Sequence, residues 1–391
     1  MGATAAVITA KGIAAIASIQ LTGELAKTII EKIFKLNSTR RTVLEPSAIL
    51  VGKIIDHDRI IDEVVIGCEA PDTFTINCHG NPLIVEMIMK LLKEHGADLI
   101  TAEQMLAGQF AKSSPNAIVA EAKLIQLKAL TIEGVKIVAN QIDNGLAQTV
   151  SRWLTDFDTL TLGQIQNECK QILADSEIAY LIINGATIVI AGPPNSGKST
   201  LLNCLSGRQK AIVTEIAGTT RDYVGSTCRI GPIVADLIDT AGLNENLASS
   251  SIDAEAQKRT LCLINESDLL LLVLDSSTSP ETTKPTIPED LKSADRLLVV
   301  LNKSDLGSNL DKSILEFDFA DTATISAKYA TGIEELTKKT LKILRVDSFD
   351  PGTPICFTER QKNLLQTLLS TKTKPDVKPL ITQLLNAPVC V

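Results

Sequence analysis

The chain carries, at residues 192–199, the stretch Gly-Pro-Pro-Asn-Ser-Gly-Lys-Ser, which fits the pattern G-x-x-x-x-G-K-[ST]. The apolar, β-branched residues 186–191 precede it and predict a buried strand. Residues 200–205 follow it and predict the start of a helix. A loop between a strand and a helix N-terminus directs backbone N–H groups and the positive end of the helix dipole at one point. The stretch therefore predicts a phosphate-binding loop.

This loop predicts specific contacts with a nucleotide. Lys198 is expected to reach the β- and γ-phosphates, and the Ser199 hydroxyl is expected to bind Mg²⁺. The residues expected to line the phosphates are Asn195, Ser196, Gly197, Lys198, Ser199 and Thr200.

A second phosphate motif closes a later apolar strand at residues 236–242, Asp-Leu-Ile-Asp-Thr-Ala-Gly. Asp239 is expected to hold Mg²⁺ through water, and the Gly242 N–H is expected to meet the γ-phosphate. The next residue is Leu243, whereas a glutamine at this place would position the attacking water. Another group must therefore orient that water.

Between these two motifs lie residues 218–222, Gly-Thr-Thr-Arg-Asp, where a switch loop covers the γ-phosphate. The switch residues are Gly218, Thr219 and Thr220. Either threonine could supply a hydroxyl to Mg²⁺, and Thr220 is taken as that ligand.

Two later motifs predict the base that the site accepts. Asp305, in the stretch Asn-Lys-Ser-Asp at residues 302–305, can accept hydrogen bonds from the N1–H and N2–H₂ groups of guanine. Adenine offers neither donor and would leave the carboxylate unpaired, so the motif predicts GTP. Residues 326–328, Ser-Ala-Lys, follow a short strand and are expected to support the base with main-chain N–H groups. The predicted guanine-binding residues are Asn302, Lys303, Asp305, Ser326, Ala327 and Lys328.

Length and composition limit the remaining possibilities. The 391 residues have room for two to three domains, and 45% are hydrophobic but only 3% aromatic, so the core is aliphatic. The net charge of −8 means that a polyanion can bind only through a local patch. The eight cysteines include no C-x-x-C, which argues against disulfides or a zinc site and predicts a cytoplasmic protein. The longest apolar run, Leu269–Leu274, is too short to span a membrane, and no membrane association is expected.

The pattern along the chain predicts a multidomain α/β fold. Residues 1–114 mix short strands with helices, including a helix over 24–36, and predict an α+β domain. Residues 115–184 predict a helical domain, and 185–346 a GTPase domain with a mostly parallel sheet and flanking helices. Residues 347–391 begin with a turn-rich linker and predict further helices. We expect those helices to fold back on 115–184, so that the GTPase domain is inserted into the helical domain.

This domain order resembles the MnmE/TrmE family of tRNA modification GTPases. The resemblance is strong in three segments: residues 192–203, residues 211–222 (Ala-Ile-Val-Thr-Glu-Ile-Ala-Gly-Thr-Thr-Arg-Asp) and residues 239–243 (Asp-Thr-Ala-Gly-Leu). It is weaker at residues 78–83, Cys-His-Gly-Asn-Pro-Leu, which resemble the family stretch G-H-G-G-P.

The resemblance implies properties that the motifs alone do not give. It implies a homodimer formed through the N-terminal domain, GTPase domains that pair across their nucleotide faces, and a role in tRNA wobble-uridine modification with a flavin-containing partner. It also implies a potassium ion bound by Asn195 and by main-chain oxygens of 214–218, including Thr214 and Ile216. A cation there would offset charge that develops between the β- and γ-phosphates.

The chain departs from the family at the catalytic and thiol motifs. The family's water-activating glutamate falls at residues 248–253, Ala-Ser-Ser-Ser-Ile-Asp, so the candidates here are Glu245 or Asp253. Without such a group turnover is expected to be slow, because general-base help is worth roughly 10²–10⁴-fold. The family's C-terminal motif C-[IVL]-G-K is not matched by the final residues 386–391, although they contain Cys390.

A third departure concerns folate, which the family binds through an arginine of its N-terminal domain. The matching position is Gln20, and a second folate-contacting stretch reads Lys-Ser-Ser-Pro-Asn at residues 112–116. A glutamine cannot give the bidentate charged contact that an arginine gives to a carboxylate. This substitution argues against folate as a cofactor.

Two alternatives to tRNA modification follow. The chain could be a diverged paralogue that keeps GTP-driven dimerisation as a switch or scaffold without modifying tRNA, which the lost folate and thiol positions favour. It could also be a ribosome-assembly GTPase related to Era and Der, although no basic RNA-binding appendage is present.

Overall fold

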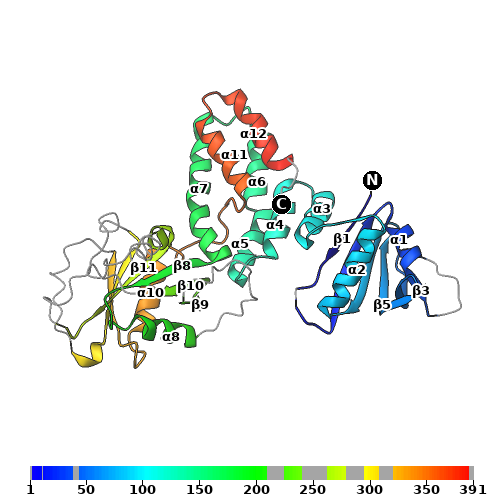
Figure 1. Cartoon of the computed structure of the whole chain (residues 1–391). Helices are drawn as coiled ribbons and strands as arrows, with labels where there is room; N and C mark the ends of the chain where they lie inside the picture. Colours follow the sequence, from blue (N-terminus) through cyan, green and yellow to red (C-terminus); the bar gives the residue numbers. More distant parts are fainter. Residues whose placement is uncertain are drawn as a thin grey trace, which may run out of the picture. The chain divides into compact units, whose positions relative to one another are not determined.

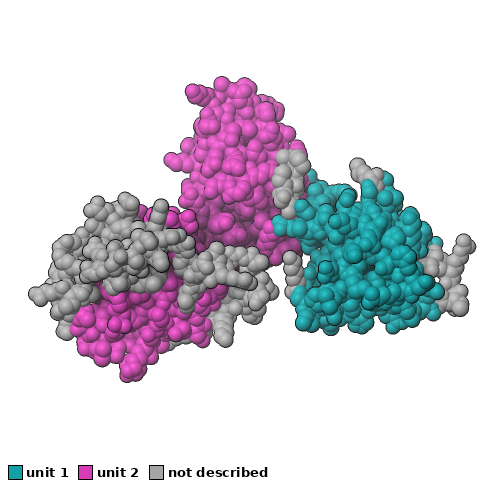
Figure 2. Space-filling model, viewed as in Figure 1, with its two compact units in different colours: residues 1–115, 388–391 teal, residues 116–387 magenta. Residues whose placement is uncertain are grey.

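The computed structural model describes residues 2–10, 12–37, 44–208, 224–239, 262–278, 295–307 and 320–386. The chain divides into two compact units (Figure 2), Met1–Pro115 and Asn116–Ala387. Each unit has its own sheet and its own hydrophobic core.

The first unit is built on a seven-stranded sheet in the order β3-β4-β5-β6-β2-β1-β7. Its strands are β1 (Ala3–Val7), β2 (Ile16–Gly23), β3 (Phe34–Leu36), β4 (Ile49–Asp56), β5 (Arg59–Ala70), β6 (Thr73–His79) and β7 (Ala97–Leu99). Neighbouring strands pair antiparallel except β1 and β7, which are parallel. Its helices are α1 (Ala26–Ile33), α2 (Pro82–Glu94) and α3 (Ala102–Ser113).

One face of this sheet forms the core of the first unit. Alternate residues of the strands, such as Ile19 and Ile76, are fully buried in one cluster with Ile30 of α1 and Leu92 of α2. The helix predicted over 24–36 is longer than the observed helix α1, which spans Ala26–Ile33. Helix α1 ends at Ile33, because the next three residues pair with β4 as β3 and bury Phe34 against the core.

The second unit contains a helical cluster made from two separate parts of the chain (Figure 1). Its helices are α4 (Ala117–Gln126), α5 (Ile132–Asp143), α6 (Leu146–Thr155), α7 (Leu162–Asn184), α11 (Glu359–Ser370) and α12 (Lys374–Asn386). Trp153 and Ile165 share one buried core with Leu365 and Ile381, as expected for helices that fold back.

A buried ion pair joins the two parts of this cluster. Arg360 of α11 donates to both carboxylate oxygens of Glu121 on α4, at 2.6 and 2.7 Å. Gln361 donates to the same carboxylate at 2.7 Å, so all three side chains have partners although Glu121 is only 3% exposed. A buried charge is tolerated when it is paired and hydrogen-bonded in this way.

The second sheet has the order β13-β12-β11-β8-β10-β9 and is parallel except for the β9–β10 pair. Its strands are β8 (Ala186–Ala191), β9 (Val224–Ile230), β10 (Ile233–Asp239), β11 (Leu269–Asp275), β12 (Leu297–Asn302) and β13 (Asp321–Thr324). The other elements in the described part of this region are α8 (Lys198–Arg208), the 3₁₀ turn η4 (Ser304–Leu306) and α10 (Ile333–Ile343). The central strands are buried on both faces, which explains their continuous apolar sequences.

The chain passes between the helices and this sheet through two tightly packed connections. Gly185 ends α7 with φ 91°, and a Cβ at this place would lie 2.9 Å from the Val234 carbonyl oxygen. Where the chain leads from the sheet back to the helices, the buried Gln141 side chain donates to the Thr353 carbonyl and accepts from the Ile355 N–H. The two sheets and the helical cluster confirm the multidomain α/β fold, while the exact boundaries at 114, 184 and 346 stay predictions.

Candidate functional site

Those predicted site residues that the structure describes gather at one edge of the second sheet. The parallel strands β8, β11 and β12 end together at this edge, next to the end of β10. Loops at the carboxyl ends of parallel strands are where open α/β sheets bind ligands. Residues 192–197 connect β8 to α8, so the phosphate loop has the strand–loop–helix geometry that its sequence predicts.

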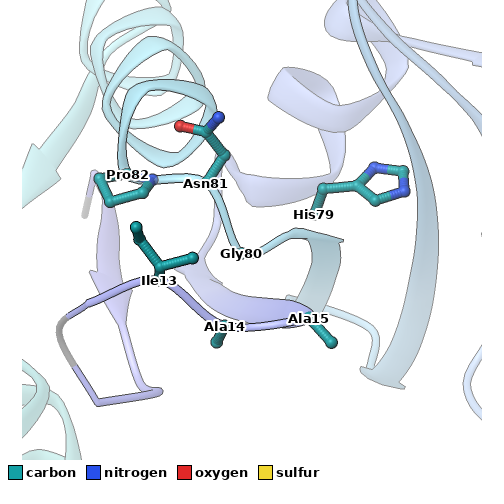
Figure 3. A pocket seen from close by; sticks show the side chains of 7 residues that line it. All are labelled: Ile13, Ala14, Ala15, His79, Gly80, Asn81 and Pro82. Atoms are coloured by element: carbon teal, nitrogen blue, oxygen red, sulfur yellow. The ribbon is translucent and has the colours of Figure 1, made fainter.

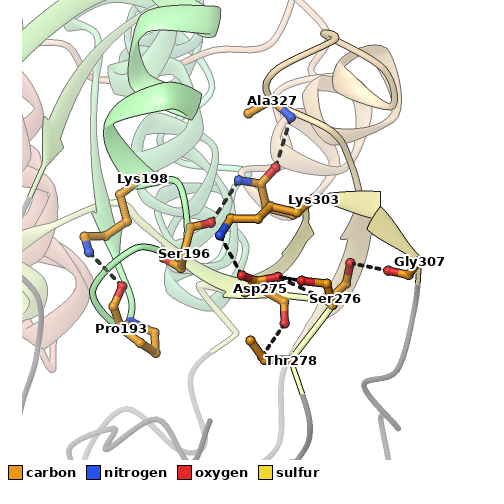
Figure 4. Close-up of polar contacts among 11 residues, drawn as sticks. Pro193, Ser196, Lys198, Asp275, Ser276, Thr278, Lys303, Gly307 and Ala327 are labelled. Carbon is orange, nitrogen blue, oxygen red and sulfur yellow. Dashed lines mark hydrogen bonds and ion pairs between the residues drawn. The ribbon is translucent and has the colours of Figure 1, made fainter. Parts of the chain in front are cut away.

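Lys198 is held over this loop by main-chain oxygens. Its Nζ donates to the Gly192 carbonyl at 3.1 Å. It also donates to the Pro193 carbonyl at 3.0 Å (Figure 4). Burial lowers the pKa of Lys198, and the nearby Asp239 carboxylate partly offsets this effect. The ammonium group is thus held at the main chain of the loop by two carbonyl oxygens, where it can pair with phosphate oxygens.

Two of the three predicted Mg²⁺ ligands, Ser199 and Asp239, lie together. Ser199 Oγ donates to Asp239 Oδ2 at 2.7 Å. Asp239 Oδ1 is buried and has no hydrogen-bond partner among the residues that the structure describes. Ser199 Oγ and the Asp239 carboxylate, with its buried and unpaired Oδ1, are oxygen ligands that suit a hard divalent cation with an oxygen and water shell.

Asn302 links the phosphate loop to the base motifs. Its amide donates to the Ser196 carbonyl at 2.9 Å and accepts from the Ala327 N–H at 2.9 Å. Asp305 accepts from Ser326 Oγ at 2.5 Å, which brings the second base motif against the first. Lys328 lies beside the Tyr329 ring, 5.0 Å from its centroid.

Several predicted residues lie outside the described part of the chain. They are Thr214, Ile216, Gly218, Thr219, Thr220, Gly242, Glu245 and Asp253. Their roles in the switch, in cation binding and in catalysis stay predictions, as do the contacts of the described residues with bound nucleotide.

Sequence reasoning missed the turn after β11. Asp275 forms an ion pair with Lys303, Nζ to Oδ2 2.6 Å, and Ser276 contacts both ends of the 302–307 segment. A signal was present, because the polar stretch Asp-Ser-Ser at 275–277 directly follows a buried strand that neighbours β8 and β12.

Comparison with known proteins shows the family. Residues 3–114 match the family profile described as "GTP-binding protein TrmE N-terminus", and residues 187–303 match "50S ribosome-binding GTPase". The tRNA modification GTPase MnmE of Alkaliphilus metalliredigens is 30% identical over 94% of this chain and 88% of its own length. That of Enterococcus faecalis is also 30% identical, over 86% and 79%.

The chain belongs to the MnmE/TrmE family of tRNA modification GTPases. It is a GTP-hydrolysing enzyme. Among solved structures, the G domain of the T. maritima FeoB iron transporter is 26% identical over 40% of this chain and 98% of its own, with a TM-score of 0.32. That structural similarity is too low to add to the MnmE/TrmE assignment.

The residues at the expected folate position of this MnmE/TrmE-family chain do not suit a carboxylate ligand. Gln20 is buried, donates to Glu69 Oε2 at 3.0 Å and accepts from Gln109 Nε2 at 2.8 Å. Both ends of the amide are therefore engaged, and Glu69 adds a negative charge where the family has a positive one. The site does not fit folate by the contact that the family arginine supplies.

The stretch that resembles G-H-G-G-P lines a cavity of about 230 Å³ in the same unit (Figure 3). Cys78 and His79 point to opposite faces of β6, because Cys78 is buried in the core and His79 is exposed, so they cannot share a metal ion. The His79 ring extends away from Ile13 and Pro82 and is held by Asp62, Nδ1 to Oδ1 2.7 Å.

No helix in the described ranges has the length and apolar character needed to cross a membrane. The described residues likewise include no cluster of three or more histidine, cysteine or acidic residues arranged to bind a metal.

Replacing Lys198 by alanine is expected to weaken GTP binding by more than about 100-fold, since hydrogen bonds to charged groups contribute about 1.5–3 kcal/mol each and Lys198 is expected to make at least two. Titration of the purified variant with a fluorescent GTP analogue measures this. Lys338→Ala, at an exposed position of α10 in the same domain, is the matched control. An unchanged affinity for Lys198→Ala would remove this loop from phosphate binding.

Proposed function

We propose that this chain is a Mg²⁺- and K⁺-dependent GTPase that hydrolyses GTP to GDP and phosphate in tRNA wobble-uridine modification. The observation that carries the proposal is that the phosphate loop and the base motifs are hydrogen-bonded to each other through one side chain. One buried amide, Asn302, connects the phosphate loop to the base motifs in a chain that is 30% identical to MnmE over 94% of its length. The relatives are named as tRNA modification GTPases, which supports the same cellular role here.

Different residues are proposed to bind the phosphates, the guanine base and Mg²⁺. Lys198 pairs with the β- and γ-phosphates, and Asp305 accepts from the guanine N1–H and N2–H₂ groups. Ser199 and Asp239 hold Mg²⁺, which neutralises charge on the phosphate oxygens. The buried, unpaired Asp239 Oδ1 fits this assignment. The water-orienting group is proposed to be Glu245 or Asp253.

The potassium ligand is proposed to be Asn195, together with main-chain oxygens of Thr214 and Ile216. Asn195 is exposed on the phosphate loop with φ 61°, a conformation in which asparagine is tolerated better than most residues. A carboxamide oxygen here suits a weakly hydrated monovalent cation beside the phosphates. In this position the cation would stabilise charge that develops in the transition state.

The proposed assembly is a homodimer formed through the first unit, acting with a flavin-containing partner on tRNA. The alternative is a GTP-driven dimerisation switch or scaffold that no longer modifies tRNA. One observation favours this alternative: Gln20, Glu69 and Gln109 satisfy one another at the family's folate position.

GTP hydrolysis with Mg²⁺ is expected to be at least about 10-fold faster in potassium chloride than in sodium chloride at equal ionic strength, because one electrostatic stabiliser contributes roughly 10²–10³-fold to kcat. Asn195→Gly keeps the positive φ but removes the carboxamide, and should abolish the difference between the salts. Equal rates in both salts for the unchanged protein would remove potassium from the proposal.

The tRNA role is tested by mass spectrometry of tRNA nucleosides from a strain that lacks this chain. We expect the modified wobble uridines to disappear and to return on expression of the chain but not of its Lys198→Ala variant. A normal nucleoside profile in the deletion strain, with GTP binding intact in the purified protein, would instead support the switch or scaffold.

A further inference from the structure

The turn that follows β11 lies directly against the segment that carries the predicted base contacts. Figure 4 shows Asp275, the last residue of β11, and Ser276 of the turn facing Lys303 and Gly307. Lys303 Nζ lies 2.6 Å from Asp275 Oδ2, and the side chains are 31% and 14% exposed. This ion pair is therefore partly shielded from water. The attraction between the two charges is stronger there than on an open surface.

The Asp275 carboxylate is also oriented by hydrogen bonds that do not involve Lys303. Its Oδ1 accepts hydrogen bonds from the Ser277 N–H at 3.0 Å and the Ser277 hydroxyl at 2.6 Å. Burial acts to raise the pKa of the Asp275 carboxyl, but the hydrogen bonds from Lys303 and Ser277 outweigh it and hold the pKa below its usual value. The carboxylate is thus charged and oriented at neutral pH, with Oδ2 directed at the ammonium group.

Ser276 holds the base segment at both ends. Its backbone N–H donates to the Asn302 carbonyl at 2.9 Å, and its hydroxyl donates to the Gly307 carbonyl at 3.3 Å. The turn after β11 therefore contacts the 302–307 segment at its start, at Lys303 and at its end. Asp305, the predicted guanine acceptor, lies between these contacts.

The Lys303 backbone needs such support. Its φ is 62°, a left-handed conformation that costs a non-glycine residue free energy unless the surroundings impose it. A lysine side chain also loses substantial rotamer entropy when it is held in one geometry. The Asp275 carboxylate at the end of β11 forms an ion pair with the ammonium group of Lys303, which directly follows β12. The hydrocarbon stem of Lys303 must therefore cross the carboxyl edge of these two strands, beside Asp305.

We propose that Asp275 is a positioning residue for guanine-nucleotide binding. By holding Lys303 Nζ, it keeps the Lys303 stem as one wall of the base site and keeps the 302–305 turn in its binding conformation before nucleotide arrives. This inference rests on the proposed guanine site at Asp305. It adds a residue that lies outside the four sequence motifs.

The mechanism predicts a distinctive pattern of nucleotide affinities. A hydrocarbon wall contacts the face of any purine, so its loss should weaken GTP, GDP and ITP by the same factor. Asp305, in contrast, distinguishes guanine from hypoxanthine, because ITP lacks the N2 amino group. A change at Asp275 should therefore leave the ratio of GTP to ITP affinity unaltered, whereas a change at Asp305 should lower it.

The test is equilibrium titration of Asp275→Asn with GTP, GDP and ITP, together with steady-state hydrolysis. We expect each nucleotide to bind about 10-fold more weakly, the difference that one charge-assisted hydrogen bond makes. KM for GTP should rise by a similar factor while kcat at saturation is unchanged. Asp321→Asn is the matched control: it breaks a second Asp–Lys pair of the same domain, with Lys339 at 3.2 Å, away from the base residues.

A double-mutant cycle shows whether Asp275 acts through Lys303. In a Lys303→Met background, Asp275→Asn should have no further effect on nucleotide affinity. Ser277→Ala is the milder second variant, because it removes one of the two hydrogen bonds that orient the carboxylate. It is expected to weaken all three nucleotides by about 3-fold, so the proposal stays testable if Asp275→Asn does not fold.

The variant Asp305→Asn shows whether a negative result contradicts the guanine site or only the role of Asp275. If it leaves the ratio of GTP to ITP affinity unchanged, the guanine site itself is wrongly assigned. If it lowers the ratio while Asp275→Asn and Ser277→Ala bind all nucleotides within 2-fold of the unchanged protein, only the inference about Asp275 is overturned. A fall in the GTP to ITP ratio for Asp275→Asn would also overturn it, since that result indicates direct recognition of the base.

Discussion

The Asn302 side chain is the constraint on which the nucleotide site depends. Its amide is 2% exposed and joins the Ser196 carbonyl of the phosphate loop to the Ala327 N–H of the base loop. These loops follow β8 and β13, which are separated in the sheet by β11 and β12. A buried amide that loses its partners costs free energy, so one side chain fixes the spacing between the loops that are proposed to bind phosphate and base. Gly197 permits this, because a Cβ there would lie 2.2 Å from Asn302 Nδ2.

The same edge of the sheet carries three carboxylates that would otherwise repel a nucleotide. Each is engaged by a neighbour: Asp239 by Ser199, Asp275 by Lys303, and Asp305 by Ser326. Their negative charge is thus directed at cations and hydrogen-bond donors, while Lys198 and the N-terminus of α8 are the groups proposed to meet the phosphates. The helical cluster is held together across the chain, because Glu121 and Gln141 precede the GTPase sheet in sequence and bond to Arg360 and Ile355, which follow it.

Local sequence patterns predicted the fold class and the strand and helix that flank the phosphate loop, while the roles of the candidate site residues stay predictions. The strand expected over 186–191 is β8, and the phosphate loop follows it, since strand, glycine loop and helix start are adjacent in sequence. Contacts between distant residues were not predictable in the same way. Glu121 meets Arg360 239 residues later, and Gln20 meets Gln109 89 residues later. The helix predicted to reach residue 36 ends at Ile33 because strand pairing outweighs local helix preference.

The most direct test of this account is the affinity of Asn302→Ala for Mg²⁺-GDP and Mg²⁺-GTP, with far-UV circular dichroism to confirm folding. The substitution leaves the Ser196 carbonyl and the Ala327 N–H buried without their partner, each at a cost of about 1–3 kcal/mol. If Asn302 holds the phosphate and base loops in register, both nucleotides should bind more weakly by roughly 100-fold or more. A folded variant that binds both nucleotides within about 3-fold of the unchanged protein, a difference under about 1 kcal/mol, would contradict that claim.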